Sequence, residues 1–210
     1  GLGLEFAWAQ WKHEEIQEGF LVSGILIPLI IPVNTPLWML VIAVAFAVIF
    51  AKEIFGGTGM NIFNVAIAVR MFLFFSYPGS MTGDKCWIYQ SNIFGLGYDL
   101  PDTFTQATPL GAIAQGITPH FSMADMFWGF IPGSIGETSV VAIALGGILL
   151  LVTGIASWKT MSSVFIGGIA MSLIFTATGQ SPIVWYEQLI MGGFMFGAVF
   201  MATDPVTSAR

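Results

Sequence analysis

The chain has 210 residues, of which 56% are hydrophobic and only 9% are charged, and its net charge is −6. Soluble proteins carry roughly 25% charged residues, so this composition cannot cover a water-facing surface and instead predicts an integral membrane protein. The six basic residues exclude a nucleic-acid partner, and the single cysteine excludes an internal disulfide. No polar linker separates the hydrophobic runs, which predicts one transmembrane domain over residues 1–210.

The first 19 residues combine tryptophans with charged side chains. Trp8 and Trp11 are followed by Lys12 and, a little further on, by three glutamates. Aromatic and charged side chains gather where a bilayer meets water, so residues 1–19 are predicted to form an interfacial helix on the membrane surface. The chain begins without an initiator methionine, a basic region or a small-residue cleavage site, and we interpret it as a fragment of a longer polypeptide.

Three short apolar runs follow, at residues 20–31, 37–51 and 62–77. Proline and glycine interrupt the sequence between and within them. As a helix, the run 37–51 is roughly 22 Å long, whereas a bilayer core needs roughly 30 Å, so these segments are predicted to be short or broken. The glycines around Gly56 and Gly57 allow positive φ and close approach of backbone or ligand. Such breaks form sites in transporters, but small residues also serve tight helix packing, and the residue pattern leaves both interpretations open.

The second half of the chain contains two runs of spanning length among shorter ones. Residues 109–116 and 121–131 are too short to cross a bilayer, whereas residues 139–156 and 161–178 are predicted to span it. A last apolar run, residues 189–203, ends at Asp204 followed by proline. The predicted fold is therefore all-α and polytopic, with broken helices.

The basic residues predict the orientation of the chain. If residues 109–138 enter the membrane and return on the same side, one face collects Lys12, Lys52, Lys159 and Arg210. The opposite face then collects Asp84, Lys85, Asp99, Asp102 and Glu187. The positive-inside rule makes the first face cytoplasmic, so the polar connection at residues 79–108 is predicted to be extracytoplasmic.

A polar, turn-rich island closes this connection at residues 102–111. It holds Asp102 and the hydroxyls of Thr103, Thr105 and Thr108, and Pro109 ends the polar run. By residue type alone, this is a loop in which a threonine caps a short helix that opens on proline.

Five separate motifs occur at residues 19–29, 52–59, 107–111, 133–139 and 201–206, among them Ala-Thr-Pro-Leu-Gly at 107–111 and Ala-Thr-Asp-Pro at 202–205. With these motifs, the chain resembles the family of the B subunit of the Na⁺-translocating NADH:quinone oxidoreductase over nearly its whole length. The sister family, the D subunit of the Rnf electron-transport complex, shares the glycine, Ala-Thr and Asp-Pro motifs. The sequences at 74–78 and 83–87 favour the quinone-reductase branch.

The resemblance implies FMN held through its phosphate on a threonine. A flavin transferase recognises Asp, then Ser or Thr three residues later, and Ala-Thr at the end. Asp102, Thr105, Ala107 and Thr108 match those positions, so Thr108 is the implied acceptor. The resemblance also implies riboflavin as a second cofactor and two inverted repeats similar to those of urea transporters.

The implied function is that of a translocase component in the bacterial inner membrane. Electrons from NADH would pass through FMN and riboflavin to quinone, coupled to Na⁺ export. The implied partners are the other subunits of the complex, the flavin transferase, quinone, Na⁺ and lipid. The alternatives are an electron carrier like the D subunit of the Rnf complex, a flavin-free channel or permease for a small neutral solute, and a scaffolding subunit.

Four further residues are candidate site residues. Quinone is predicted to lie against Gly56 and Gly57, where the resemblance and the absence of side chains coincide. Glu137 and Asp204 are assigned to the ion pathway; Asp204 ends an apolar run, where carboxylates are rare, although an acid before proline is equally typical of a turn. The sequence has two histidines, so neither a hydrolytic triad nor a histidine-built metal site is predicted.

Overall fold

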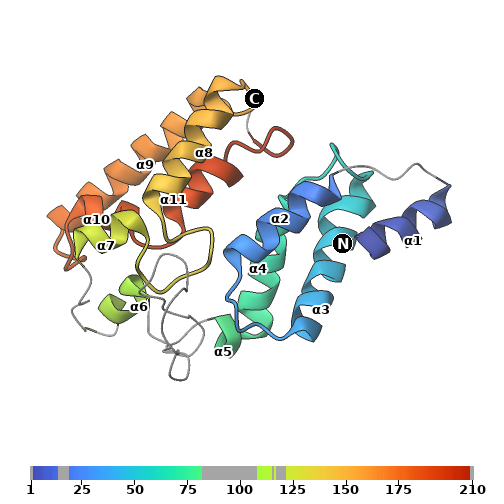
Figure 1. Ribbon diagram of the computed structural model, residues 1–210, viewed down its shortest axis with the longest axis horizontal. Coiled ribbons are helices and arrows are strands. Elements are labelled where there is room, and N and C mark those ends of the chain that lie inside the picture. The colour runs from blue at the N-terminus through green and yellow to red at the C-terminus, as the bar shows by residue number, and fades with distance from the viewer. Residues whose placement is uncertain (1, 14–18, 82–107, 115, 117–121, 209–210) are drawn as a thin grey trace, which may run out of the picture. The chain divides into compact units, whose positions relative to one another are not determined.

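The computed structural model describes residues 2–13, 19–81, 108–114, 116 and 122–208 (Figure 1). All the regular secondary structure of these residues is helical, which confirms the predicted all-α class for this part of the chain. The contacts between residues divide the chain into two compact units, Gly1–Thr82 and Gly83–Arg210, called here the N-terminal and the C-terminal unit. The first part of the predicted attachment motif, namely Asp102, Thr105 and Ala107, lies outside the described residues.

The described residues of the N-terminal unit form five α-helices, one π-helical turn and one 3₁₀-helical turn. They are α1 (Leu2–Lys12), α2 (Phe20–Ile30), α3 (Leu37–Ala47), the π-helical turn η1 (Val48–Lys52), the 3₁₀ turn η2 (Glu53–Phe55), α4 (Val65–Ser76) and α5 (Pro78–Met81). Proline sets two boundaries: α3 begins directly after Pro36, and α2 stops just before Pro32. The start of α4 is fixed by Asn64, whose Oδ1 accepts hydrogen bonds from the N–H groups of Ala66 and Ile67 at 2.9 and 3.3 Å.

The packing of α3 against α4 forms the core of this unit. Ala43 and Ala47 on α3 and Val69 and Leu73 on α4 are fully buried, and the small alanines let the two helices approach closely. At the outer edge of the pair, Phe46 stacks on Phe72 with ring centroids 4.7 Å apart. Two further helices of the unit, α2 and α5, pack against α4.

The helix that begins with α3 is longer than the sequence predicts. It continues through η1 and η2 to Phe55 without interruption, so that Leu37–Phe55 has 19 residues and a length of roughly 28 Å, enough to cross a bilayer core. The prediction ended this run at residue 51 because Lys52 and Glu53 are charged. That boundary is wrong, since both side chains are buried inside the unit and Lys52 is neutralised by an acid from α1.

The C-terminal unit consists of short, broken helices around two longer ones. Its described elements are α6 (Pro109–Ala114), α7 (Met123–Trp128), α8 (Val140–Val152), α9 (Trp158–Ala177), α10 (Trp185–Ile190), α11 (Phe194–Phe196) and the π-helical turn η3 (Gly197–Met201). The six-residue helices α6 and α7 confirm the prediction that these runs are too short to span a membrane. The run 189–203 is broken at Gly192, whose φ is +73°, which confirms a broken helix here.

One of the two predicted spans is shorter than expected. The helix α9 has 20 residues and spanning length, whereas α8 has only 13 and does not extend to residue 156. It ends because Gly154 adopts a φ of +72° and the N–H of Ile155 turns back to the carbonyl of Leu150. Two described helices, Leu37–Phe55 and Trp158–Ala177, are thus long and apolar enough to cross a membrane.

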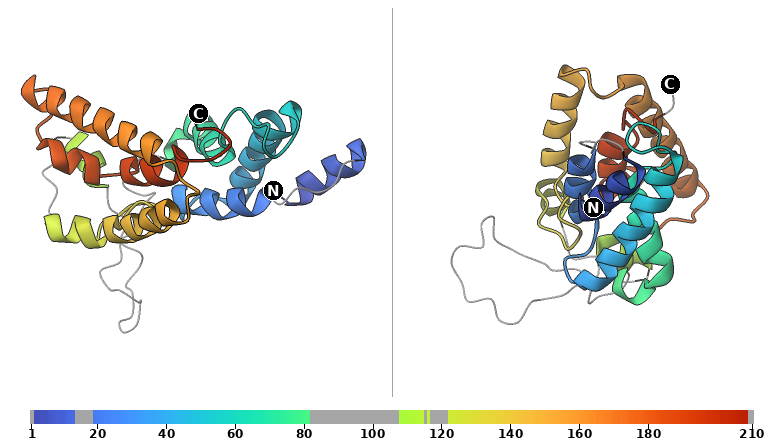
Figure 2. Two further views of the ribbon diagram at one scale, coloured as in Figure 1. Left: turned by 90° about the horizontal axis from the view of Figure 1, so that it is seen from above. Right: turned by 90° about the vertical axis from the view of Figure 1, so that its right-hand side faces the viewer.

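Glycines on α8 and α9 receive the side chains of the broken helix. The turn η3 lies between α8 and α9 (Figure 2). A Cβ atom on Gly146 would lie 2.6 Å from the Phe200 ring, and one on Gly168 would lie 2.3 Å from the Phe194 ring. The small residues on these two helices therefore serve tight packing.

Candidate functional site

Thr108, the predicted flavin acceptor, caps the short helix α6. Its Oγ1 accepts a hydrogen bond from the N–H of Gly111 at 3.1 Å, and its carbonyl accepts one from the N–H of Ala112 at 2.9 Å. The side chain is half-buried, and the Pro109 that follows is fully buried. The hydroxyl oxygen thus acts as an acceptor in the cap.

Apolar contacts hold α6 in place within the C-terminal unit. Ile113 packs against a cluster formed by Met126, Ile131 and Met191, which come from α7, the loop after it and the end of α10. Leu110 lies beside Gly192, where a Cβ atom would be 3.8 Å from its Cδ2. The helix that follows Thr108 is therefore anchored at both the helix break and α7.

Gly56 and Gly57, the predicted quinone contacts, form the turn after η2. Their φ angles are +116° and +87°, and their N–H groups donate to the carbonyls of Glu53 and Lys52 at 3.3 and 3.1 Å. Gly56 is exposed with Met60 beside it, whereas Gly57 is buried. Both glycines are accounted for by the reversal of the chain at the helix end, because side chains disfavour positive φ.

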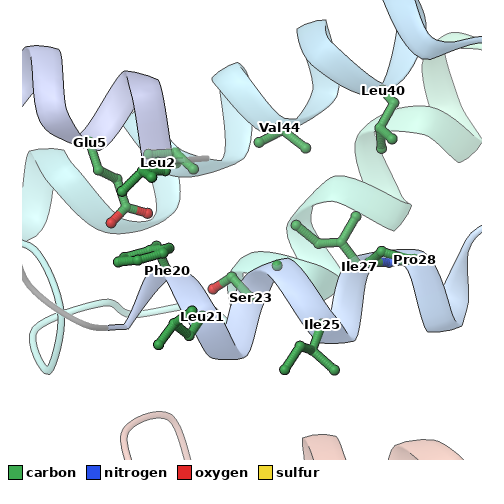
Figure 3. Close-up of a pocket in the computed structure, with 12 residues that line it drawn as sticks. Leu2, Glu5, Phe20, Leu21, Ser23, Ile25, Ile27, Pro28, Leu40 and Val44 are labelled. Carbon is green, nitrogen blue, oxygen red and sulfur yellow. The ribbon is translucent and has the colours of Figure 1, made fainter.

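A cavity of about 430 Å³ lies elsewhere in the N-terminal unit (Figure 3). Side chains of α1, α2, α3 and η1 line it: Leu2, Glu5, Phe20, Leu21, Ser23, Gly24, Ile25, Ile27, Pro28, Leu40, Val44 and Val48. Neither Gly56 nor Gly57 belongs to this lining. The walls are almost entirely hydrocarbon, and the carboxylate of Glu5 lies at one end, beside Phe20 (Figure 3).

Glu5 forms a buried ion pair with Lys52. Its Oε2 lies 2.8 Å from the Lys52 Nζ, the side chains are only 5% and 3% exposed, and Glu53 Oε1 lies 4.0 Å from the same ammonium. The pair joins α1 to the π-helical end of α3. Removing one member of such a pair leaves a buried charge and costs about 3–5 kcal/mol. The sequence interpretation missed this pair because no local spacing connects residues 47 positions apart.

Glu137 is buried in the loop between α7 and α8. Its Oε1 accepts a hydrogen bond from the N–H of Ser134 at 3.3 Å, and its own N–H donates to the Ser134 carbonyl at 3.1 Å. Glu137 is 6% exposed and Ser134 is fully buried. Within the described residues, no group of three His, Cys, Asp or Glu side chains could hold a metal ion.

Asp204 is half-buried and forms a turn. Its Oδ1 accepts from the N–H of Val206 at 3.2 Å, and its Oδ2 accepts from the Thr207 hydroxyl at 2.8 Å. The preceding Thr203 is buried and donates its hydroxyl to the carbonyl of Val199. These bonds match the turn-forming alternative, and an ion-pathway role for Asp204 stays a prediction.

The composition, the helical fold and the interrupted helices together define a polytopic membrane protein with broken helices. The model of the NQR2, RnfD, RnfE family matches residues 1–210, and the chain belongs to this family. It is 42% identical over 214 residues to a protein of Chromohalobacter salexigens, covering 98% of this chain and 49% of that protein. Similar relatives occur in Ectopseudomonas mendocina, with 41% identity over 98% of this chain and 51% of the relative, and in Klebsiella pneumoniae, with 41% over 98% and 50%.

All three relatives are named as the B subunit of the Na(+)-translocating NADH-quinone reductase. The resemblance to this family predicted from the sequence motifs is therefore confirmed. The chain spans about half the length of the curated relatives that it matches.

Proposed function

We propose that this chain forms part of a redox subunit of a Na⁺-translocating NADH:quinone oxidoreductase in the bacterial inner membrane. The observation that carries the proposal is the similarity over 98% of the chain to three proteins that are named as the B subunit of that enzyme. In this proposal, the chain works inside a multi-subunit complex and passes electrons from NADH through FMN and riboflavin towards quinone. An electron carrier of the Rnf type is the second candidate, because the matching family model includes RnfD.

The local structure of Thr108 supports its role as the FMN acceptor. A phosphoester replaces the hydroxyl hydrogen and keeps the oxygen, and it is the oxygen that accepts the Gly111 N–H in the cap. The helix α6 can therefore persist after modification. When bound, FMN supplies the one- and two-electron redox chemistry, whereas the protein supplies position and electrostatics.

The cavity between α1, α2 and α3 supports a quinone site in the N-terminal unit. Quinones carry a polar ring on an apolar tail, and a cavity with hydrocarbon walls and a carboxylate at one end matches both parts. Reduction of quinone to quinol consumes two electrons and two protons, and Glu5 is an ionisable group at the cavity end. Gly57 bears on this site indirectly, since its N–H donates to the carbonyl of Lys52, the ion-pair partner of Glu5.

The exposed apolar surface supports a membrane location. Only 11% of an 18-residue apolar stretch of α9 is buried within the protein. The large side chains of Ile166, Met171 and Ile174 on this helix are 67%, 49% and 52% exposed. Lipid or neighbouring transmembrane subunits would cover such a surface. Trp38 at the start of α3 and Tyr77 at the end of α4 lie edge-to-face, and aromatic residues of this kind are enriched where a bilayer meets water.

Substitution of Thr108 by valine tests the flavin assignment. Thr108→Val keeps the shape of the side chain and removes the hydroxyl, so mass spectrometry of the peptide around position 108 should show no FMN adduct. Loss of the cap should cost only about 1 kcal/mol, so the complex should still assemble. An adduct that persists on Thr103 or Thr105 would show that the acceptor is another threonine of the island.

A further inference from the structure

The loop between α7 and α8 is closed at its neck by direct backbone contact. Gly129 ends α7 with a φ of +95°, and a Cβ atom built on it would lie 2.8 Å from Ser139 Cβ and 2.9 Å from Ser139 Cα. Ser139 in turn caps α8, because its Oγ accepts the N–H of Ala142 at 3.3 Å. The residues between these two positions therefore form a compact loop whose ends touch, a type of loop that is frequently functional.

The buried residues of this loop include two polar side chains, Ser134 and Glu137. Ser134 is fully buried, and the Glu137 side chain folds back over the preceding backbone, where a Cβ atom on Gly133 would lie 3.8 Å from its Oε1. The Ser134 N–H donates to that same oxygen at 3.3 Å. The carboxylate and the serine thus lie together in a stretch of non-helical backbone, which also provides carbonyl oxygens.

The Ser134 hydroxyl has no hydrogen-bond partner among the described residues, although the oxygen is buried. Burying a hydroxyl without a partner costs roughly 1–3 kcal/mol, so this oxygen, which no described side chain uses, is buried at a cost in stability. The oxygens of an ionised carboxylate and of a hydroxyl both carry lone pairs, so both can serve as ligands of a cation or accept hydrogen bonds from water. A small species that satisfies both oxygens is a cation or a water molecule.

We propose that the Ser134 hydroxyl and the Glu137 carboxylate bind a Na⁺ ion within this loop. This inference rests on the proposed function, which supplies Na⁺ as the transported ion. A hard cation prefers oxygen ligands, and interrupted helices and irregular backbone supply such ligands in transporters.

The test uses the complete complex and two responses to Na⁺, with K⁺ keeping the ionic strength constant. A ligand that binds only the folded state raises the thermal unfolding midpoint as its concentration increases. For Ser134→Ala, the Na⁺ concentration at half-maximal stabilisation and the apparent KM for Na⁺ in turnover should both rise about 5- to 10-fold, as expected for one lost ligand.

Two further variants make the result specific to the hydroxyl. Ser134→Thr keeps an oxygen ligand and should restore the wild-type Na⁺ dependence. Ser134→Cys keeps the size but offers a soft sulfur that Na⁺ disfavours, so it should behave like Ser134→Ala and serves if the alanine variant does not assemble. Ser163→Ala, at an exposed serine of α9 whose hydroxyl donates to the carbonyl of Thr160, is the control and should change nothing.

The outcomes separate this inference from the proposed function. If Ser134→Ala and Ser134→Cys keep the wild-type Na⁺ dependence, the buried oxygen binds a water molecule and the inference is wrong. If the wild-type complex itself shows no Na⁺ dependence in turnover, the proposed Na⁺-translocating function fails first. A rise in the Na⁺ requirement that appears equally in Ser163→Ala would also overturn the site.

Discussion

The two compact units each bury a glutamate, but they hold it in different ways. In the N-terminal unit, Glu5 meets the ammonium of Lys52 at 2.8 Å, and the pair joins α1 to the end of α3. In the C-terminal unit, Glu137 accepts the backbone N–H of Ser134, three residues earlier, inside a loop closed by Gly129. The first carboxylate thus ties two distant helices together, whereas the second completes a local turn.

The difference indicates what each glutamate can do. Glu5 is committed to a strong charge partner, so it holds the wall of the apolar cavity in place and presents its carboxylate at the cavity end. Glu137 receives a weaker N–H bond and lies beside a hydroxyl that no described side chain uses. The N-terminal arrangement therefore suits a bound organic molecule, and the C-terminal arrangement suits a small ion.

Breaking the ion pair should give the largest effect on stability. Glu5→Ala leaves the Lys52 ammonium buried without its carboxylate, so the free energy of unfolding should fall by about 3–5 kcal/mol. Thermal unfolding of the purified complex measures this loss. The double variant Glu5→Leu with Lys52→Met removes both charges and should recover most of the stability, because a well-packed apolar pair replaces a buried ion pair at little cost. If the double variant is as unstable as Glu5→Ala, the two side chains stabilise the unit through their packing rather than through their charges.

Forcing the neck of the C-terminal loop should give a smaller effect. Gly129→Ala adds a Cβ atom that collides with the Ser139 backbone and strains a φ of +95°, so the complex should lose roughly 2–3 kcal/mol. The matched control is Gly154→Ala, which also has positive φ, at +72°, but no atom within 4 Å of the added Cβ. The control should lose only roughly 1–2 kcal/mol, the cost of the left-handed backbone alone. Equal losses in both variants would show that the neck is not closed in solution.

Filling the cavity should leave stability nearly unchanged and act on quinone. Val44→Phe adds volume to the lining of the cavity and should raise the apparent KM for quinone about 3- to 10-fold. Val41→Phe changes the same helix at a side chain that is 64% exposed and does not line the cavity, so its KM should stay at the wild-type value. Steady-state quinone reduction by the complete complex provides the comparison. A normal KM in Val44→Phe would move the quinone site away from this cavity and back to the turn at Gly56 and Gly57.

Local features of the fold could be predicted from the sequence. The all-α class, the shortness of α6 and α7 and the break before η3 follow from composition, proline and glycine. The cap made by Thr108 follows from the residue types around Pro109. Each of these features depends on neighbours within a few positions, where turn and cap chemistry is decided.

Features that depend on distant residues could not be predicted. The charge of Lys52 suggested the end of a hydrophobic run, because only the folded chain brings Glu5 to it. The early end of α8 at Val152 was missed for another reason, since hydropathy continues through residue 156 and does not report the conformation of Gly154. The cavity is likewise built by three helices and leaves no local pattern.

The central claim is that this chain is a flavin-carrying redox component, and one measurement tests it most directly. The purified complex is denatured, its subunits are separated by electrophoresis under denaturing conditions, and the flavin fluorescence of the band is recorded. We expect fluorescence on the band of the wild-type protein and none on that of Thr108→Val. A wild-type band without fluorescence, from a complex that contains all its subunits, would contradict the claim and favour a channel, a permease or a scaffold.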